Sequence, residues 1–172
     1  MIRHVLAAFA VASASLTAMA VPALAAPAAT TTVCGPTIRN IVRTGTPDLE
    51  TFSSTFIPLA GAAVTVTVPA GRSECLKVLV TMFASCGDGK KLTLGELCRL
   101  RVLDNSAQFM PALPPWDGVI IQSSTEYPAG QAMEFVRRVG PGKHVIAVQV
   151  RTFAPTIDFE INVWTMDVTV TN

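Results

Sequence analysis

In the stretch 86-CGDGKKLTLGELC-98, a Gly-Asp-Gly turn and two lysines lie between two cysteines. Residues of these types could bind a phosphate or a metal ion. A phosphate-binding P-loop reads G-x-x-x-x-G-K-[ST]. Here Ala84 stands five residues before Gly89, and Lys91 occupies the position of the serine or threonine. An EF-hand calcium loop is also absent, because Asp88 has no acidic partners at the required offsets. We therefore interpret the stretch as a loop closed by a disulfide.

Four cysteines, Cys34, Cys75, Cys86 and Cys98, allow three disulfide connectivities. If Cys75 to Cys86 forms one strand, its ends lie about 36 Å apart and cannot bridge each other. If the strand that begins at Cys98 pairs antiparallel with it, Cys98 lies opposite Cys86. The spacing thus predicts the links Cys34–Cys75 and Cys86–Cys98.

Histidine-based catalysis has one candidate, because His144 is the only histidine left once a signal peptide containing His4 is removed. It follows a Gly-Pro-Gly-Lys turn and opens a strand. That position is typical of a strand-end surface residue, whereas a Ser-His-Asp triad is defined by its geometry. A zinc site is similarly short of ligands if all cysteines are oxidised. We predict no enzymatic activity, no metal and no cofactor.

One pair of carboxylates, Asp158 and Glu160, lies on one face of an expected strand, about 7 Å apart. Such a pair could hydrolyse a glycosidic bond. Together with Asp104 and Asn105, or with Asp117, it could instead hold Ca²⁺ through oxygen ligands. Because the two residues alternate with apolar ones, we favour the solvent side of a half-buried strand.

Charge gives little sign of an ionic partner: the chain has 13 Lys+Arg and 12 Asp+Glu. Nucleic acid and anionic membranes require clustered excess positive charge, so neither is expected as a partner. Several arginines are interspersed with acidic residues on expected strands, which favours a solvated sheet face over an anion site. They are Arg99, Arg101, Arg137, Arg138 and Arg151.

Aromatic residues are few, so their positions are informative. Trp164 is in step with apolar neighbours and is expected in the core. Trp116 lies beside Asp117 in the proline-rich loop 111-PALPPWDG-118, and Tyr127 lies in 126-EYPAG-130. Function in β-sandwiches concentrates in loops. We therefore select Trp116, Asp117 and Tyr127 as a candidate surface for a glycan or a protein; the alternative is that Trp116 seals one end of the core.

The N-terminus has the pattern of a secretory signal peptide over residues 1–25. Arg3 and His4 precede an uncharged run that ends on the small-x-small motif Ala23-Leu24-Ala25. An uncleaved anchor is the alternative, but serine, threonine and proline make the run a poor membrane span. We expect a secreted or periplasmic protein with a leader over 26–54, held by Cys34, and a β-sandwich domain over 55–172.

Period-two alternation dominates the chain from residue 55 onward. Strands are predicted at 62–68, 75–86, 98–104, 107–110 and 119–122. The segment 132–153 reads as a hairpin joined by Gly-Pro-Gly-Lys. The last run, 157–171, changes its apolar face at Val163-Trp164, which indicates a bulge. Residues 75–86 are apolar on both faces, as in a strand buried on both sides. The pattern predicts a single antiparallel β-sandwich of jelly-roll type with eight or nine short strands, two disulfides and little helix.

The runs "VTVPAGRSECLKVLVTMFASC", "CRLRVLD", "MEFVRRVGPGKHVIAVQVRT" and "INVWTMDVTVTN" resemble uncharacterised bacterial secreted β-sandwich proteins over residues 55–172. More distantly, the pattern is similar to jelly rolls of the C1q and tumour-necrosis-factor type, which implies trimers. We expect an exported, non-catalytic protein that acts by binding or as a structural surface component. The alternatives are a carbohydrate-binding or carbohydrate-active protein and a self-associating structural protein.

Overall fold

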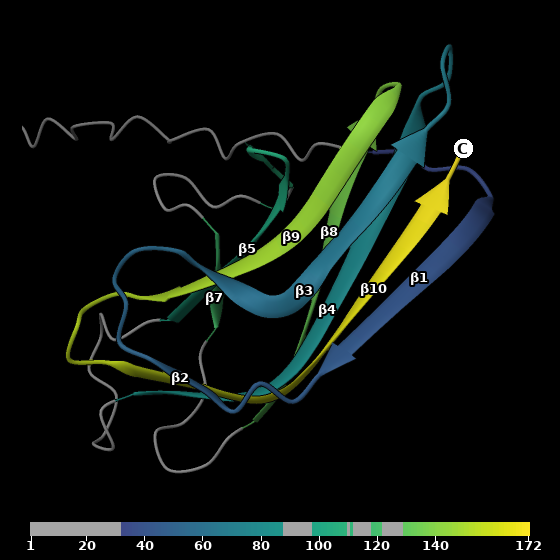
Figure 1. Ribbon diagram of the computed structural model, residues 1–172. Helices are drawn as coiled ribbons and strands as arrows, with labels where there is room; N and C mark the ends of the chain where they lie inside the picture. Colours follow the sequence, from purple (N-terminus) through teal and green to yellow (C-terminus); the bar gives the residue numbers. More distant parts are fainter. Residues whose placement is uncertain (1–31, 88–97, 110, 112–117, 122–128) are drawn as a thin grey trace, which may run out of the picture. The chain divides into compact units, whose positions relative to one another are not determined.

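The computed structural model describes residues 32–87, 98–109, 111, 118–121 and 129–172. All regular structure in these ranges is β-strand, and the strands form two antiparallel sheets (Figure 1). No segment of the described chain is a helix with the length and apolar character needed to cross a membrane. The predicted all-β class is confirmed.

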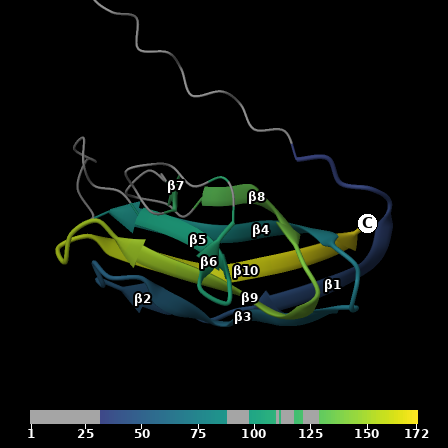
Figure 2. The same ribbon diagram turned by 90° about the horizontal axis from the view of Figure 1, so that it is seen from above.

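Sheet A contains β1 (Thr37–Gly45), β10 (Asp158–Thr171), β4 (Glu74–Gly87) and β8 (Ala129–Val139), in that order. The short β2 (Leu49–Thr51) pairs with β10 beyond the end of β1. Figure 2 shows β8, β4 and β10 side by side.

Sheet B contains β3 (Ile57–Val68), β9 (Gly142–Thr152) and β5 (Cys98–Asp104), in that order. Two short strands, β6 (Ala107–Gln108) and β7 (Val119–Ile121), pair with β5. In Figure 1, β3 and β9 of sheet B are drawn in front of β4 and β8 of sheet A.

The pairings are nested along the chain. β1 pairs with β10, β3 with β9, β4 with β8, and β5 with β7. A long hairpin that rolls up on itself produces such nested antiparallel pairs and divides them between two sheets. This arrangement is the jelly roll. The jelly-roll prediction is therefore confirmed by the strand order.

Alternating side chains build the core between the sheets. On β3, Val64, Val66 and Val68 are buried, while Thr65 and Thr67 between them are exposed. A pleated strand puts successive side chains on opposite faces, so every second residue faces the other sheet. β4, β5, β9 and β10 contribute their inward residues to the same cluster.

Trp164 of β10 lies in this core with 2% of its surface exposed, as expected from its alternation. Gly45 makes room for the indole, and Gly61 approaches it at ordinary contact distance. A Cβ added to Gly45 would lie 2.6 Å from Cζ2 of Trp164, and one added to Gly61 would lie 3.5 Å from the same atom. Gly61 also has φ of +75°, a conformation that side-chain-bearing residues rarely adopt.

The predicted hairpin over 132–153 is wrong. β8 belongs to sheet A, where it pairs with β4, whereas β9 belongs to sheet B, between β3 and β5. The Gly-Pro-Gly turn therefore carries the chain from one sheet to the other. An alternating strand buries one face in either arrangement, so alternation alone does not reveal the partner strand.

The sandwich begins before residue 55, because β1 and β2 fall inside the segment 26–54 that was expected to be a leader. β1 is an edge strand with largely exposed side chains, which left little alternation to detect. Cys34 is bonded to Cys75 with the Cα atoms 5.6 Å apart, as predicted. It thereby attaches the chain just before β1 to the start of β4.

The second disulfide, Cys86–Cys98, is also the predicted one, with the Cα atoms 5.8 Å apart. The pairing assumed for it is wrong, however. β5 does not pair with β4 but lies in the opposite sheet. The bond therefore joins the end of β4 in sheet A to the start of β5 in sheet B.

Candidate functional site: a groove on the outer face of sheet A

A bulge in β10 shapes the outer face of sheet A. The pairing of β10 with β4 shifts its register between Ile161 and Val163, which leaves Asn162 as the extra residue. Ile161 and Trp164 both point into the core, so two consecutive residues, Asn162 and Val163, lie on the outer side. The predicted bulge is confirmed within one residue of its expected place. Val163 is thereby placed outward, where it pairs with Phe83 of β4.

Next to this pair, the outer face is hollowed. A groove of about 360 Å³ opens to solvent there. Its lining comes from three neighbouring strands of the sheet: Thr81, Met82 and Phe83 of β4, Gly130, Gln131 and Ala132 at the start of β8, and Val163, Trp164 and Thr165 of β10.

The groove results from an alternation of side-chain size along the strands. Thr165, Thr81 and Ala132 are cross-strand neighbours and form one row of small side chains. The next row places Val163 beside Phe83 and Gly130 beyond it. Phe83 and Val163 are 44% and 41% exposed. The large side chains therefore form one wall, while Gly130 has no side chain to fill the space.

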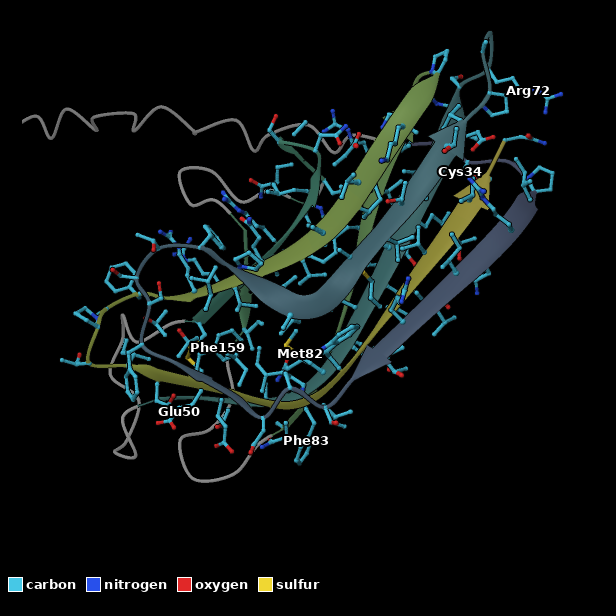
Figure 3. All side chains as sticks on the ribbon, in the orientation of Figure 1. Cys34, Glu50, Arg72, Met82, Phe83 and Phe159 are labelled. Atoms are coloured by element: carbon cyan, nitrogen blue, oxygen red, sulfur yellow. A yellow bond between two sulfur atoms is a disulfide. The ribbon has the colours of Figure 1, made fainter. Side chains whose placement is uncertain are left out.

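Phe83 belongs to the solvent side of the sheet. In Figure 3 its ring projects away from the sandwich, whereas Met82 and Phe159 point into the space between the sheets. The sequence-based expectation that β4 is buried on both faces is therefore wrong: Leu79 and Phe83 are exposed. Apolar residues at the outward positions of a strand were the available signal for this surface.

In the described part of the chain, charged residues lie beside the groove but not in its lining. Asp167 and Glu134 are the cross-strand neighbours of Leu79 on the row beyond Thr165, Thr81 and Ala132. Asp167 accepts a hydrogen bond from Asn40 Nδ2 at 3.2 Å. The described lining is thus an uncharged, largely apolar hollow that carries threonine hydroxyls. Acidic residues lie on the rows to either side of it, with Asp167 and Glu134 on one side and Glu160 on the other.

The carboxylate pair lies beyond the groove, towards the Cys86 end of the sheet. Glu160 accepts hydrogen bonds from Asn162 Nδ2 at 2.8 Å and Ser85 Oγ at 3.3 Å, and it lies opposite Glu50 of β2. Burial raises the pKa of the Asp158 carboxyl above its usual range, and the charges of Glu50 and Glu160 raise it further. Neither Asp158 nor Glu160 lines the groove.

Metal ligation finds no support in the described residues, which contain no group of three or more histidine, cysteine, aspartate or glutamate side chains that could hold an ion. Asp104, one suggested calcium ligand, belongs to a different sheet from Asp158 and Glu160. The other, Asp117, lies outside the described residues.

His144 is not the surface residue expected from its place after a turn. Its Nδ1 lies 2.9 Å from both carboxylate oxygens of Asp104, and its Nε2 lies 2.9 Å from the carbonyl oxygen of Gly140. Arg137 of β8 reaches the same Asp104 carboxylate at 3.6 Å and donates to the carbonyl of Gln108 at 2.8 Å. These contacts join the two sheets near the β8–β9 connection.

The five arginines do not share one solvated face. Arg99 is 1% exposed, and Arg137 extends from sheet A to sheet B, so the expectation fails for these two. Arg101 and Arg151 stack on the ring of Phe56, with the guanidinium carbons 3.9 and 4.7 Å from its centroid.

The loop residues selected from sequence, Trp116, Asp117 and Tyr127, lie outside the described residues. Their role as a binding surface stays a prediction. The groove on sheet A was not selected, because its side chains come from strands and its shape depends on cross-strand neighbours.

Comparison with known proteins adds no argument to the description above. No family model and no curated protein matches the chain. Among solved structures, the chain is similar to one described as "Crystal structure of dimeric latent PorU from Porphyromonas gingivalis", with a TM-score of 0.37 and 9% identity over 84% of this chain and 14% of that chain. The match covers a small part of that structure, and a likeness at this level supports no argument. The resemblance to secreted β-sandwich proteins holds for the all-β fold class alone.

Proposed function

We propose that the protein is an exported, non-catalytic binding protein whose ligand sits in the groove on the outer face of sheet A. The observation that carries this proposal is the groove itself. Its volume of about 360 Å³ falls within the range of about 300–1,000 Å³ typical of small-molecule sites. Phe83 and Val163 are exposed neighbours beside this hollow, and contiguous exposed apolar side chains mark interaction sites in many proteins.

Export is supported by the two disulfides and by the signal-peptide pattern at residues 1–25. Disulfides persist in oxidising compartments and are rare in the cytosol, so Cys34–Cys75 and Cys86–Cys98 are consistent with an extracytoplasmic location. Whether the protein is released or retained in the periplasm is decided by fractionation of cells that produce it.

A non-catalytic role is supported by what surrounds the two candidate catalytic groups. His144 faces a carboxylate on one side and a backbone carbonyl on the other, so neither ring nitrogen faces a nucleophile. Asp158 and Glu160 lie together on one sheet face rather than on two sides of the groove. Glycosidases place their two carboxylates on either side of the scissile bond.

The test fills the groove without disturbing the fold. A Cβ added to Gly130 would meet no heavy atom within 4 Å, so Gly130→Leu projects into the hollow. Gly140→Leu is the matched control, because a Cβ there also meets nothing within 4 Å and Gly140 does not line the groove. The oxidised protein is screened against cell-wall glycans, peptides and lipid vesicles. The proposal requires that Gly130→Leu loses the captured ligand while Gly140→Leu keeps it; equal binding by both variants refutes it.

A further inference from the structure

The side chains around the groove favour one class of ligand. The floor carries the hydroxyls of Thr81 and Thr165, and one wall is the exposed ring of Phe83. Among the described residues, neither hydroxyl has a hydrogen bond within the protein. A ligand that matches this surface has an apolar face to lie against the ring and hydroxyl groups to pair with the threonines.

The open shape of the groove favours amphipathic ligands over purely apolar ones. A ligand in a shallow groove keeps one side in water, and burying only part of an apolar chain forfeits much of its transfer free energy. A sugar ring does not have this difficulty, because it has C–H faces and a rim of hydroxyls. The groove crosses β10, β4 and β8, a width of about 10 Å at the usual strand spacing.

The charged residues around the groove narrow the class of ligand further. Among the residues that the structure describes, no charged side chain lines the groove, and the charged residues on the adjoining rows include Asp167, Glu134 and Glu160. An anionic ligand would be repelled by these carboxylates, whereas neutral hydroxyls can donate hydrogen bonds to them.

The same carboxylates argue against a large protein partner or a second copy of the chain. A standard protein interface buries about 800 Å² on each partner. Extending an interface from the groove past Leu79 would bury Asp167 and Glu134, and unpaired buried charges are costly. The uncharged surface is therefore sized for a small ligand.

From these features we infer that the groove binds a neutral saccharide, with one ring stacked on Phe83 and its hydroxyls bonded to Thr81 and Thr165. This inference rests on the proposed function, because it assigns a ligand class to the same groove. It leaves Asp158 and Glu160 without a catalytic role.

The experiment is calorimetric titration of the oxidised protein with two panels: neutral oligosaccharides (cello-, xylo-, malto- and chito-oligosaccharides) and anionic oligogalacturonates. Phe83→Ala should weaken binding of a neutral oligosaccharide by at least about tenfold through loss of stacking. Thr81→Val, which keeps the shape but removes the hydroxyl, should weaken it by about three- to tenfold. Phe52→Ala is the matched control, because Phe52 is 48% exposed, close to the 44% of Phe83, and does not line the groove.

The outcomes separate this inference from the proposed function. Binding of a neutral oligosaccharide that Phe83→Ala weakens by about tenfold or more and Phe52→Ala leaves unchanged supports the inference, whereas equal binding by both variants overturns it. If no neutral oligosaccharide binds, or if the oligogalacturonates bind more tightly, the inference is overturned. In that case, a peptide or lipid lost in Gly130→Leu would still support a binding groove, whereas a ligand indifferent to Gly130→Leu would refute both.

Discussion

Both disulfides should contribute several kcal/mol to the free energy of unfolding, and Cys86–Cys98 should contribute less than Cys34–Cys75. In the loop-entropy description, a cross-link stabilises the fold by restricting the unfolded chain, and longer loops give more. The separation of 12 residues for Cys86–Cys98 corresponds to about 2.9 kcal/mol. The separation of 41 residues for Cys34–Cys75 corresponds to about 3.9 kcal/mol.

The perturbation is replacement of each pair by alanine, Cys86→Ala/Cys98→Ala in one variant and Cys34→Ala/Cys75→Ala in the other. Alanine is chosen because Cys75, Cys86 and Cys98 are buried. Losing about 2.9 kcal/mol should lower the melting temperature by roughly 6–12 °C for a chain of this size.

The assay is urea unfolding with linear extrapolation, which gives the free energy of unfolding directly. The two variants serve as controls for each other, since both remove two sulfurs and differ in loop length. A loss below about 1 kcal/mol for Cys86→Ala/Cys98→Ala, or a larger loss there than for the other pair, would refute the loop-entropy reasoning.

Three further predictions concern the sheet faces and their connections. Asp158→Asn should raise the melting temperature at neutral pH. The carboxyl pKa of Asp158 is raised in the folded protein, so stability falls as the pH rises from the unfolded-state pKa of 3.8 through the folded-state pKa. Below pH 3.8 the carboxyl is protonated in both states, and the melting temperatures of the variant and the wild type should then agree. Gly45→Ala should cost roughly 1–3 kcal/mol in urea unfolding, since its Cβ would meet the Trp164 ring at 2.6 Å, and an unchanged midpoint would contradict the packing described. Asp104→Asn should lower the free energy of unfolding by roughly 2–3 kcal/mol in the same assay, because the variant loses a buried carboxylate that pairs with His144 and Arg137. A loss below about 0.5 kcal/mol would show that these contacts contribute no more than exposed salt bridges do.

The sequence predicted the fold class because its strongest signal is local. Alternation in 62–68, with valines inward and threonines outward, requires a strand with one buried face. The apolar positions of 157–171 change from odd to even numbers near Val163-Trp164, and this change required a bulge, although only Trp164 of the two is buried. Cysteine spacing predicted both disulfides.

Strand partners were harder to predict, because they depend on contacts between distant parts of the chain. The Gly-Pro-Gly turn after Val139 reverses the chain whether β9 returns to the same sheet or crosses to the other one. The correct disulfide Cys86–Cys98 was reached through a wrong pairing for a similar reason. A short loop brings two strand ends together both within one sheet and across a sandwich.

The groove escaped sequence analysis because it belongs to no single segment. Phe83, Gly130 and Val163 come from three strands, and they become neighbours through the register of β4 with β8 and with β10. The apolar character of Phe83 suggested burial, since a strand pattern does not reveal which of its faces a second layer covers.

The most direct test of the central claim, that a neutral saccharide binds on the outer face of sheet A, is an amide chemical-shift map of the oxidised protein titrated with the neutral oligosaccharide panel. We predict that the shifts concentrate at Thr81–Phe83, Gly130–Ala132 and Val163–Thr165, the three segments that line the groove. Shifts confined to the outer face of sheet B, at Thr65, Thr67 or Arg101, or no shifts at all, would contradict the account.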